Sequence, residues 1–176
     1  MRKMVLVFAL TATSAAVSAT TVLTEQNIAR LEAALPELIA IEQDNPQGLT
    51  KLRLKKHCDW QQHASDLRQQ EQGKAYVAEV DQVLEKHQLT APLFLELTAK
   101  GSWPLLQSLQ PVQQLTRQSL PFLPEPQRRI AEQKIQQTEQ MQQAIEPCLT
   151  AADKTALQHH KQRLLKLATS LPGTAF

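Results

Sequence analysis

Glycine, cysteine and aromatic residues are all scarce in this sequence. Of its 176 residues, only four are glycine and two are cysteine, and aromatic side chains make up 4%. So few glycines leave little material for phosphate-binding loops or for a β-sandwich rich in turns. Two cysteines are too few for a small protein built on a disulfide framework. The hydrophobic fraction of 42% is nevertheless too high for a disordered chain, and the length fits one domain with a substantial core.

Long hydrophobic runs and recognisable catalytic motifs are also missing. No internal stretch of about eighteen apolar residues could span a membrane. The sequence has no Gly-x-Ser-x-Gly elbow, no Cys-x-x-Cys pair, no P-loop and no dinucleotide-binding fingerprint. We therefore expect no cofactor, and the sequence favours a protein that is not an enzyme. A catalytic pair among the many surface carboxylates stays open as an alternative.

The first 19 residues have the pattern of a secretory signal peptide. Arg2 and Lys3 form a positively charged start, a short apolar stretch follows, and small residues lead up to Ala19. The alternative is a buried N-terminal helix. The pattern favours cleavage before Thr20, a periplasmic or secreted location, and a single helical domain over residues 20–176. After cleavage no transmembrane segment is expected.

Cleavage would change the net charge of the chain. The complete sequence has 19 lysine and arginine residues against 17 aspartate and glutamate residues. Since Arg2 and Lys3 precede the predicted cleavage site, the remaining chain carries no formal net charge. A neutral chain lacks the basic excess that is typical of nucleic-acid binding, so we expect no nucleic-acid partner.

Cys58 and Cys148 are the two cysteines. In an oxidising compartment we expect them to form a disulfide that closes most of the mature chain into a loop. By the chain-entropy model, such a loop stabilises the fold by about 4 to 5 kcal/mol. A metal-binding pair or two free thiols are the alternatives, and both are disfavoured because exported thiols rarely stay reduced.

Helix-forming residues dominate the rest of the chain, and 24 of them are glutamine. The dipeptide Leu-Thr recurs just before helical patterns, where the threonine can act as N-cap and the leucine as part of a hydrophobic staple. We therefore predict an all-α protein, a compact antiparallel array of about six to seven helices stapled by one disulfide. The predicted helices cover residues 25–44, 51–71, 75–87, 91–100, 103–119, 127–146 and 151–171.

Prolines interrupt this helical pattern. Pro36 and Pro111 lie inside two of the predicted helices, where we expect a kink or a break. Three further prolines crowd residues 120–126, and there we expect an extended, proline-rich hinge.

The leucine-rich stretch between residues 103 and 122 is the candidate partner surface. It contains Trp103, Leu105, Leu106, Leu109 and Phe122. Its prolines would weaken the backbone hydrogen bonding, so local opening could expose these side chains to a partner. The alternative is that they fill the core. The stretch favours an exported helical binding or chaperone-like protein that contacts another envelope or secreted protein.

Asp59 and His63 support a second hypothesis. They lie four residues apart in a predicted helix and could present two metal ligands on one face. The sequence supplies no third ligand at a recognisable spacing, so no metal site is predicted. A metal-binding protein or an enzyme that uses Asp59, His63 and other histidines is the alternative function.

Overall fold

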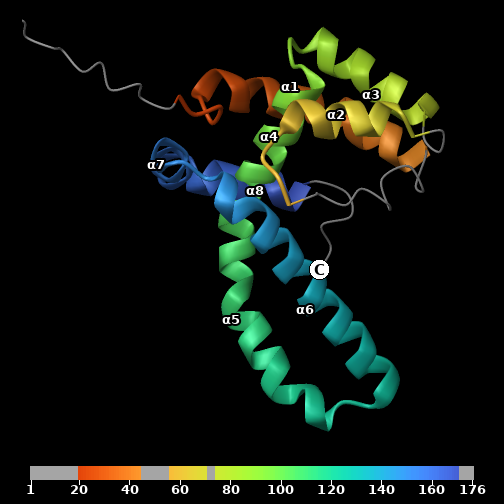
Figure 1. Ribbon diagram of the computed structural model, residues 1–176, viewed down its shortest axis with the longest axis vertical. Coiled ribbons are helices and arrows are strands. Elements are labelled where there is room, and N and C mark those ends of the chain that lie inside the picture. The colour runs from red at the N-terminus through yellow and green to blue at the C-terminus, as the bar shows by residue number, and fades with distance from the viewer. Residues whose placement is uncertain (1–19, 45–55, 71–73, 171–176) are drawn as a thin grey trace, which may run out of the picture.

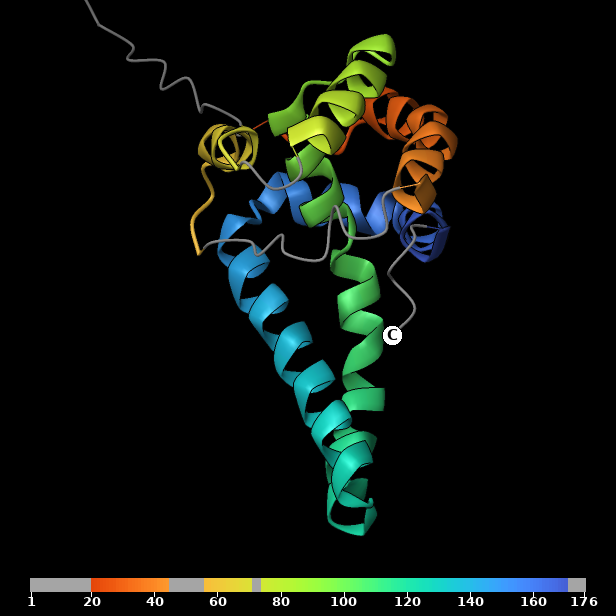
Figure 2. The same cartoon turned by 90° about the vertical axis from the view of Figure 1, so that its right-hand side faces the viewer.

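The computed structural model describes residues 20–44, 56–70 and 74–170, and every regular element in them is helical. The helices α5 and α6 project as a long antiparallel hairpin from a body formed by the other helices (Figures 1 and 2). The prediction of an all-α array is confirmed. In chain order the elements are α1 (Glu25–Asp44), α2 (Trp60–Arg68), α3 (Lys74–Lys86), α4 (Ala91–Gly101), α5 (Trp103–Ser119), η1 (Leu120–Phe122), α6 (Glu125–Ile145), η2 (Glu146–Cys148), α7 (Ala151–His159) and α8 (Lys161–Ser170).

The Leu-Thr dipeptides begin helices as predicted. The hydroxyls of Thr24 and Thr90 each accept a hydrogen bond from the backbone N–H three residues on, at 3.2 and 3.4 Å. At Thr150 the cap is reciprocal, because its hydroxyl accepts from the N–H of Asp153 while the Asp153 carboxylate accepts from the N–H of Thr150. The dipeptide at residues 49–50 lies outside the described residues.

Two predicted helices have different limits in the structure. The second helix begins at Trp60, since residues 56–59 are not helical, and the predicted start at residues 51–55 lies outside the described part. Asp59 ends this irregular segment as the N-cap, and its Oδ1 accepts from the N–H of Gln62 at 2.9 Å. The last predicted helix is divided at His160 into α7 and α8.

The expected proline breaks within helices are wrong. Both α1 and α5 continue through Pro36 and Pro111, and both prolines are exposed. A proline inside a helix lowers the stability of the helix by about 3 kcal/mol, because it removes one backbone hydrogen bond and its ring crowds the preceding turn. At an exposed position water can satisfy the carbonyl that lost its partner, and packing elsewhere along the helix offsets the rest.

The expected extended hinge over residues 120–126 is also wrong for most of its length. Its first three residues form η1, and α6 already begins at Glu125 with Pro126 in the first turn. Proline is tolerated there because its missing N–H would have had no partner within the helix. Only Leu123 and Pro124 are extended, with ψ of 141° and 146°, so the connection is a tight turn.

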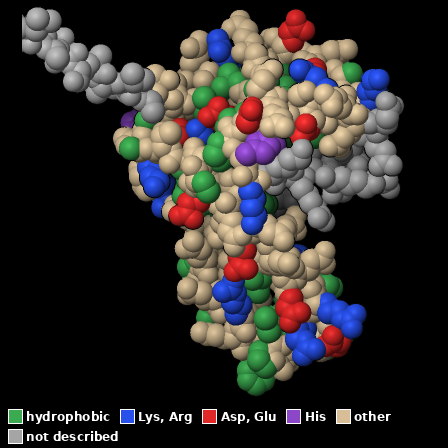
Figure 3. All heavy atoms as spheres, in the orientation of Figure 1, with side chains coloured by type: hydrophobic (Ala, Val, Ile, Leu, Met, Phe, Trp, Pro, Cys, Tyr) green, Lys and Arg blue, Asp and Glu red, His purple; other side chains and the backbone are tan. Residues whose placement is uncertain are grey.

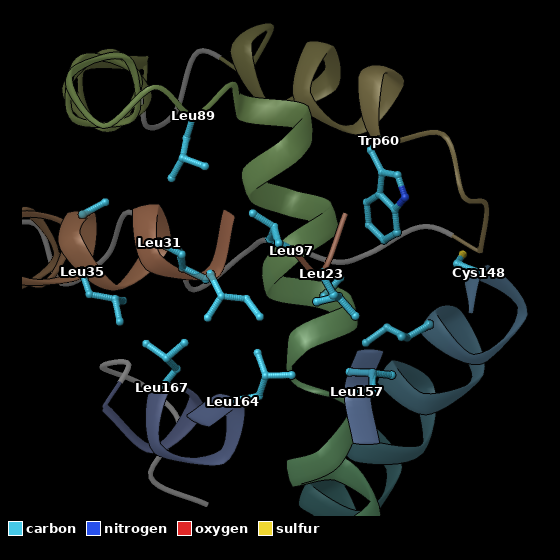
Figure 4. Close-up of a cluster of buried hydrophobic side chains, with 14 of the residues drawn as sticks. Leu23, Leu31, Leu35, Trp60, Leu89, Leu97, Cys148, Leu157, Leu164 and Leu167 are labelled. Atoms are coloured by element: carbon cyan, nitrogen blue, oxygen red, sulfur yellow. The ribbon is translucent and has the colours of Figure 1, made fainter. Parts of the chain in front are cut away.

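The hydrophobic core lies where α1, α4 and α8 meet. Ile28, Leu97 and Leu164 come from these three helices and are at most 2% exposed. Figure 4 shows Leu97 and Leu164 pointing into the same cluster, which Leu23 joins from the segment before α1. In the body α2 packs mainly against α4, and α1 against α3, so neighbours in space are not always neighbours in sequence. None of the described helices combines the length and hydrophobicity needed to cross a bilayer.

The disulfide between Cys58 and Cys148 is present, as predicted. The two sulfur atoms are 2.10 Å apart and the Cα atoms 5.4 Å apart. Cys58 lies two residues before α2, and Cys148 ends η2 at the top of α6. The bond therefore ties the segment that leads into α2 to the point where the hairpin returns to the body.

A buried charged cluster joins α4, α7 and the N-terminal segment. Lys100 Nζ lies 2.8 Å from Asp153 Oδ2 and 2.6 Å from Glu96 Oε1. The hydroxyl of Thr21 donates to Asp153 Oδ1 at 2.7 Å. Burial alone would raise the pKa of Asp153, but the hydrogen bonds from Lys100, Thr21 and Thr150 outweigh burial and hold that pKa below its usual value. Burial would likewise lower the pKa of Lys100, yet its two carboxylate partners raise it.

Candidate functional site

The α5–α6 hairpin is anchored to the body at its base. Leu106 of α5 is 1% exposed and belongs to the core, and its carbonyl accepts a hydrogen bond from Gln142 Nε2 at 3.1 Å. Farther out, Ile135 and Thr138 of α6 are buried, while Thr116 on α5 is only half-buried. The outer part of the hairpin therefore consists of α5 and α6 alone, and on α6 it buries only Ile135 and Thr138 between the turn and the residues near the body.

Four large hydrophobic side chains are exposed in the outer part of the hairpin. Phe122 in the turn is 85% exposed, Leu115 is 66% exposed, and Val112 and Ile130 are each 56% exposed. We call these four residues the tip patch. Figure 3 shows hydrophobic atoms gathered at the end of the hairpin away from the body. Single exposed leucines are ordinary, but a group that includes an exposed phenylalanine in a projecting element is typical of a contact surface.

The charged side chains around the tip patch are paired with one another. Glu125 binds both Arg128 and Arg129, the latter with a distance of 2.9 Å between Nε and Oε1. Arg117 of α5 pairs with Glu139 of α6 across the hairpin. Since Arg128 and Arg129 share one carboxylate, these five side chains leave one net positive charge, and the outer hairpin offers apolar contact area with little unbalanced charge.

The structure does not bring the five predicted partner-surface residues together. Leu106 lies in the core, Trp103 packs partly buried against it, and Leu105 and Leu109 are half-buried. Only Phe122 belongs to the exposed tip. Because α5 is continuous through Pro111, its first and last residues are about 24 Å apart along the helix axis. In the folded chain Trp103 and Phe122 therefore lie near opposite ends of α5, and contact of this stretch with a partner stays a prediction.

Three members of the tip patch are not among the five partner-surface residues that the sequence predicts. Val112 and Leu115 lie within the predicted leucine-rich stretch but outside its five named candidates, and Ile130 lies outside the stretch altogether. Val112 and Leu115 lie three residues apart, which is the spacing of a buried helical stripe. The pattern could not show that the stripe lies beyond the reach of the body, where nothing covers it among the described residues.

The Asp59 and His63 pair does not converge on a common point. The Asp59 carboxylate caps α2, whereas the His63 ring is buried and stacks on His57 with 4.1 Å between ring centroids. His63 Nε2 lies 3.1 Å from the carbonyl oxygen of His57. In the part of the chain that the structure describes, no group of three His, Cys, Asp or Glu side chains could hold a metal ion.

Comparisons with known proteins supply no family. No protein-family model, no curated protein and no solved structure matches the chain.

Proposed function

We propose that the protein is an exported, non-enzymatic binding module that contacts another envelope or secreted protein through the tip patch. The observation that carries this proposal is the 85% exposure of Phe122, at the end of a hairpin that projects from the body. Keeping a phenylalanine in water sacrifices about 1.5 to 3 kcal/mol that burial would contribute. A partner that covers the ring would recover that free energy.

The chemistry of the tip patch indicates the kind of partner. Arg117 pairs with Glu139, and Arg128 and Arg129 share Glu125, so these five side chains leave one net positive charge. That is too little for a cationic patch that binds an anionic lipid surface or a nucleic acid. The surrounding exposed side chains are largely glutamines, which are polar without being charged. An apolar groove in another protein fits this surface, with the hairpin end inserted into it.

The proposed location rests on two features. The N-terminal 19 residues have the signal-peptide pattern, and the disulfide between Cys58 and Cys148 fits an oxidising compartment. N-terminal sequencing of the protein purified from the cell envelope tests the location. A chain beginning at Thr20 is the expected result, and an intact Met1 in the cytoplasmic fraction would contradict it.

Site-specific photo-crosslinking tests the contact surface. A photoreactive residue is placed at Leu115 or Phe122, and the matched control carries it at Gln82, an exposed residue of α3 on the body. After irradiation in the native envelope, we expect one discrete adduct from both tip positions and none from Gln82. Adducts of equal yield from all three positions, or none from the tip, would contradict the proposal.

A double variant separates the effect on binding from the effect on folding. Leu115→Ser combined with Ile130→Ser should abolish the adduct formed through Phe122, because it removes half of the tip patch. The free energy of unfolding of the same variant should lie within about 0.5 kcal/mol of the parent protein's value, since both side chains are exposed. An adduct with twice the mass of this chain would show self-association and would overturn the choice of a different protein as partner.

A further inference from the structure

A cavity of about 300 Å³ lies on the body, between the start of α5, η2, α7 and the start of α8. It is separate from the tip patch, which lies at the opposite end of α5. Its volume is at the lower end of the range found for small-molecule sites. Two stretches of the chain meet there, the start of α5 and the run from η2 through α7 to the start of α8.

The apolar part of the cavity is its deeper part. Pro104 and Leu157 line it and are buried, and Trp103 lines it with its ring half-buried against the core. The indole of Trp103 offers a flat apolar surface on which a planar group can stack. Trp103 was singled out from the sequence as part of a partner surface, and the structure gives it this different environment.

The rim of the cavity carries two lysines without carboxylate partners. Lys154 and Lys161 both line the cavity, and neither forms an ion pair with any residue that the structure describes. This distinguishes them from Lys86 and Lys100, whose ammonium groups lie within 2.9 Å of carboxylates. Glu146 also lines the cavity, so the rim carries a net charge of one positive unit.

The backbone beneath both lysines is well anchored. Lys154 lies in the first turn of α7, where its N–H donates to the carbonyl of Thr150 at 3.0 Å next to the reciprocal cap. Lys161 begins α8 directly after the break at His160, and the N–H of Leu164 donates to the His160 carbonyl at 3.0 Å. The backbone positions of both lysines are therefore fixed, which reduces the conformational entropy lost when their ammonium groups bind a ligand.

We propose that this cavity binds a small organic monoanion with a flat apolar body, of the aromatic carboxylate class. The carboxylate would be held by Lys154 and Lys161, and the ring would stack against Trp103. Glu146 would repel a second negative charge, which selects a monoanion over a dianion. This inference does not depend on the proposed protein-binding role of the hairpin.

Titration of the full-length mature protein with benzoate tests the site. The chain has two tryptophans, and Trp60 is buried on α2, so the two indole N–H signals in an NMR spectrum report different places. Benzoate is expected to shift the Trp103 signal in a saturable way and to leave the Trp60 signal in place. Benzamide has the same shape without the charge and is expected to bind at least about tenfold more weakly, a difference of about 1.4 kcal/mol.

Lysine variants provide the matched controls. Lys154→Gln combined with Lys161→Gln should weaken benzoate binding about tenfold or more, without lowering the stability of the fold, because both side chains are exposed. Lys134→Gln on α6 removes one exposed lysine outside the cavity and should leave binding unchanged. Equal affinity for benzoate and benzamide, an equal loss with Lys134→Gln, or the absence of a saturable shift would each overturn the proposal.

Discussion

Lys100 Nζ lies 2.8 Å from Asp153 Oδ2, and the two residues are only 5% and 0% exposed. The pair connects α4 to the first turn of α7, and the Thr21 hydroxyl adds the N-terminal segment to it. Inside the body these charges can be kept only because each has a partner of opposite sign. The cluster therefore holds together three segments that are far apart in the chain.

Removing one member of this pair should be strongly destabilising. Asp153→Ala leaves the Lys100 ammonium buried with only Glu96 nearby, and it also removes the reciprocal cap of α7. We expect the free energy of unfolding to fall by about 3 to 5 kcal/mol in urea denaturation. Lys134→Ala, at an exposed position, should change it by less than about 0.5 kcal/mol. A loss below about 1 kcal/mol for Asp153→Ala would show that the pair contributes little.

Stability should decrease in acid because the carboxylates of Glu32 and Asp153 have lowered pKa values. Hydrogen bonding to Arg163 lowers the pKa of Glu32, and the hydrogen bonds described above lower the pKa of Asp153. The folded state then binds fewer protons than the unfolded state, so the stabilisation is present above the unfolded pKa and is lost as the pH falls below about 4. Urea denaturation at a series of pH values measures this loss. Asp153→Asn should show a shallower dependence on pH, and an unchanged dependence would assign the effect to other groups.

Reduction of the disulfide should destabilise the fold. Cys58 and Cys148 are 90 residues apart in sequence, and closing a loop of that length corresponds to about 4 to 5 kcal/mol in the chain-entropy model. We expect a loss of that order when Cys58→Ser and Cys148→Ser are combined, measured by denaturant unfolding. Thiol titration of the native parent protein should find no free thiol, and two thiols in the native state would contradict the bond.

Gln88 lies two residues after the end of α3 and has a positive φ of 56°, which an amino acid with a side chain adopts at a cost of about 1 kcal/mol. Glycine carries no such cost at a helix C-terminus. Gln88→Gly should therefore stabilise the protein by up to about 1 kcal/mol, reduced by the loss of the hydrogen bond from Arg30 Nη2 at 2.9 Å. In an Arg30→Ala background the gain should be larger, because that bond is already absent. A destabilising effect in both backgrounds would contradict this explanation.

Truncation should destabilise the protein strongly at Leu106 and hardly at all at Phe122. Leu106→Ala removes a side chain that is 1% exposed in the core and should cost about 2 to 5 kcal/mol. Phe122→Ala removes a ring that is 85% exposed and should change stability by less than about 0.5 kcal/mol. Comparable losses for the two variants would mean that Phe122 packs against the protein in solution.

Local patterns in the sequence predicted the helical class, most helix limits and the cysteine pairing. Threonine caps act within three residues, so Thr24, Thr90 and Thr150 could be identified without knowledge of their surroundings. The disulfide followed from the presence of two cysteines and the signal-peptide pattern. The start of α2 could not be predicted in this way, because residues 56–58 have helix-forming neighbours and are held out of the helix by the disulfide and the Asp59 cap.

Most of the helical residues can be identified from the sequence, because capping and helix propensity act over short distances along the chain. Which apolar helix faces are covered depends on the tertiary structure. Leu106 and Leu115 are both leucines of α5, yet one is buried by the body and the other extends beyond it into solvent. The spacing of residues in the sequence shows that one face of a helix is apolar. Whether that face is buried depends on which helix packs against it, and contacts between residues far apart in the chain determine this packing. For the same reason the sequence does not show that Lys100 pairs with Asp153, since α4 and α7 come together only in the folded chain. Likewise Trp103, Lys154 and Lys161 line one cavity only because α5, α7 and α8 pack together.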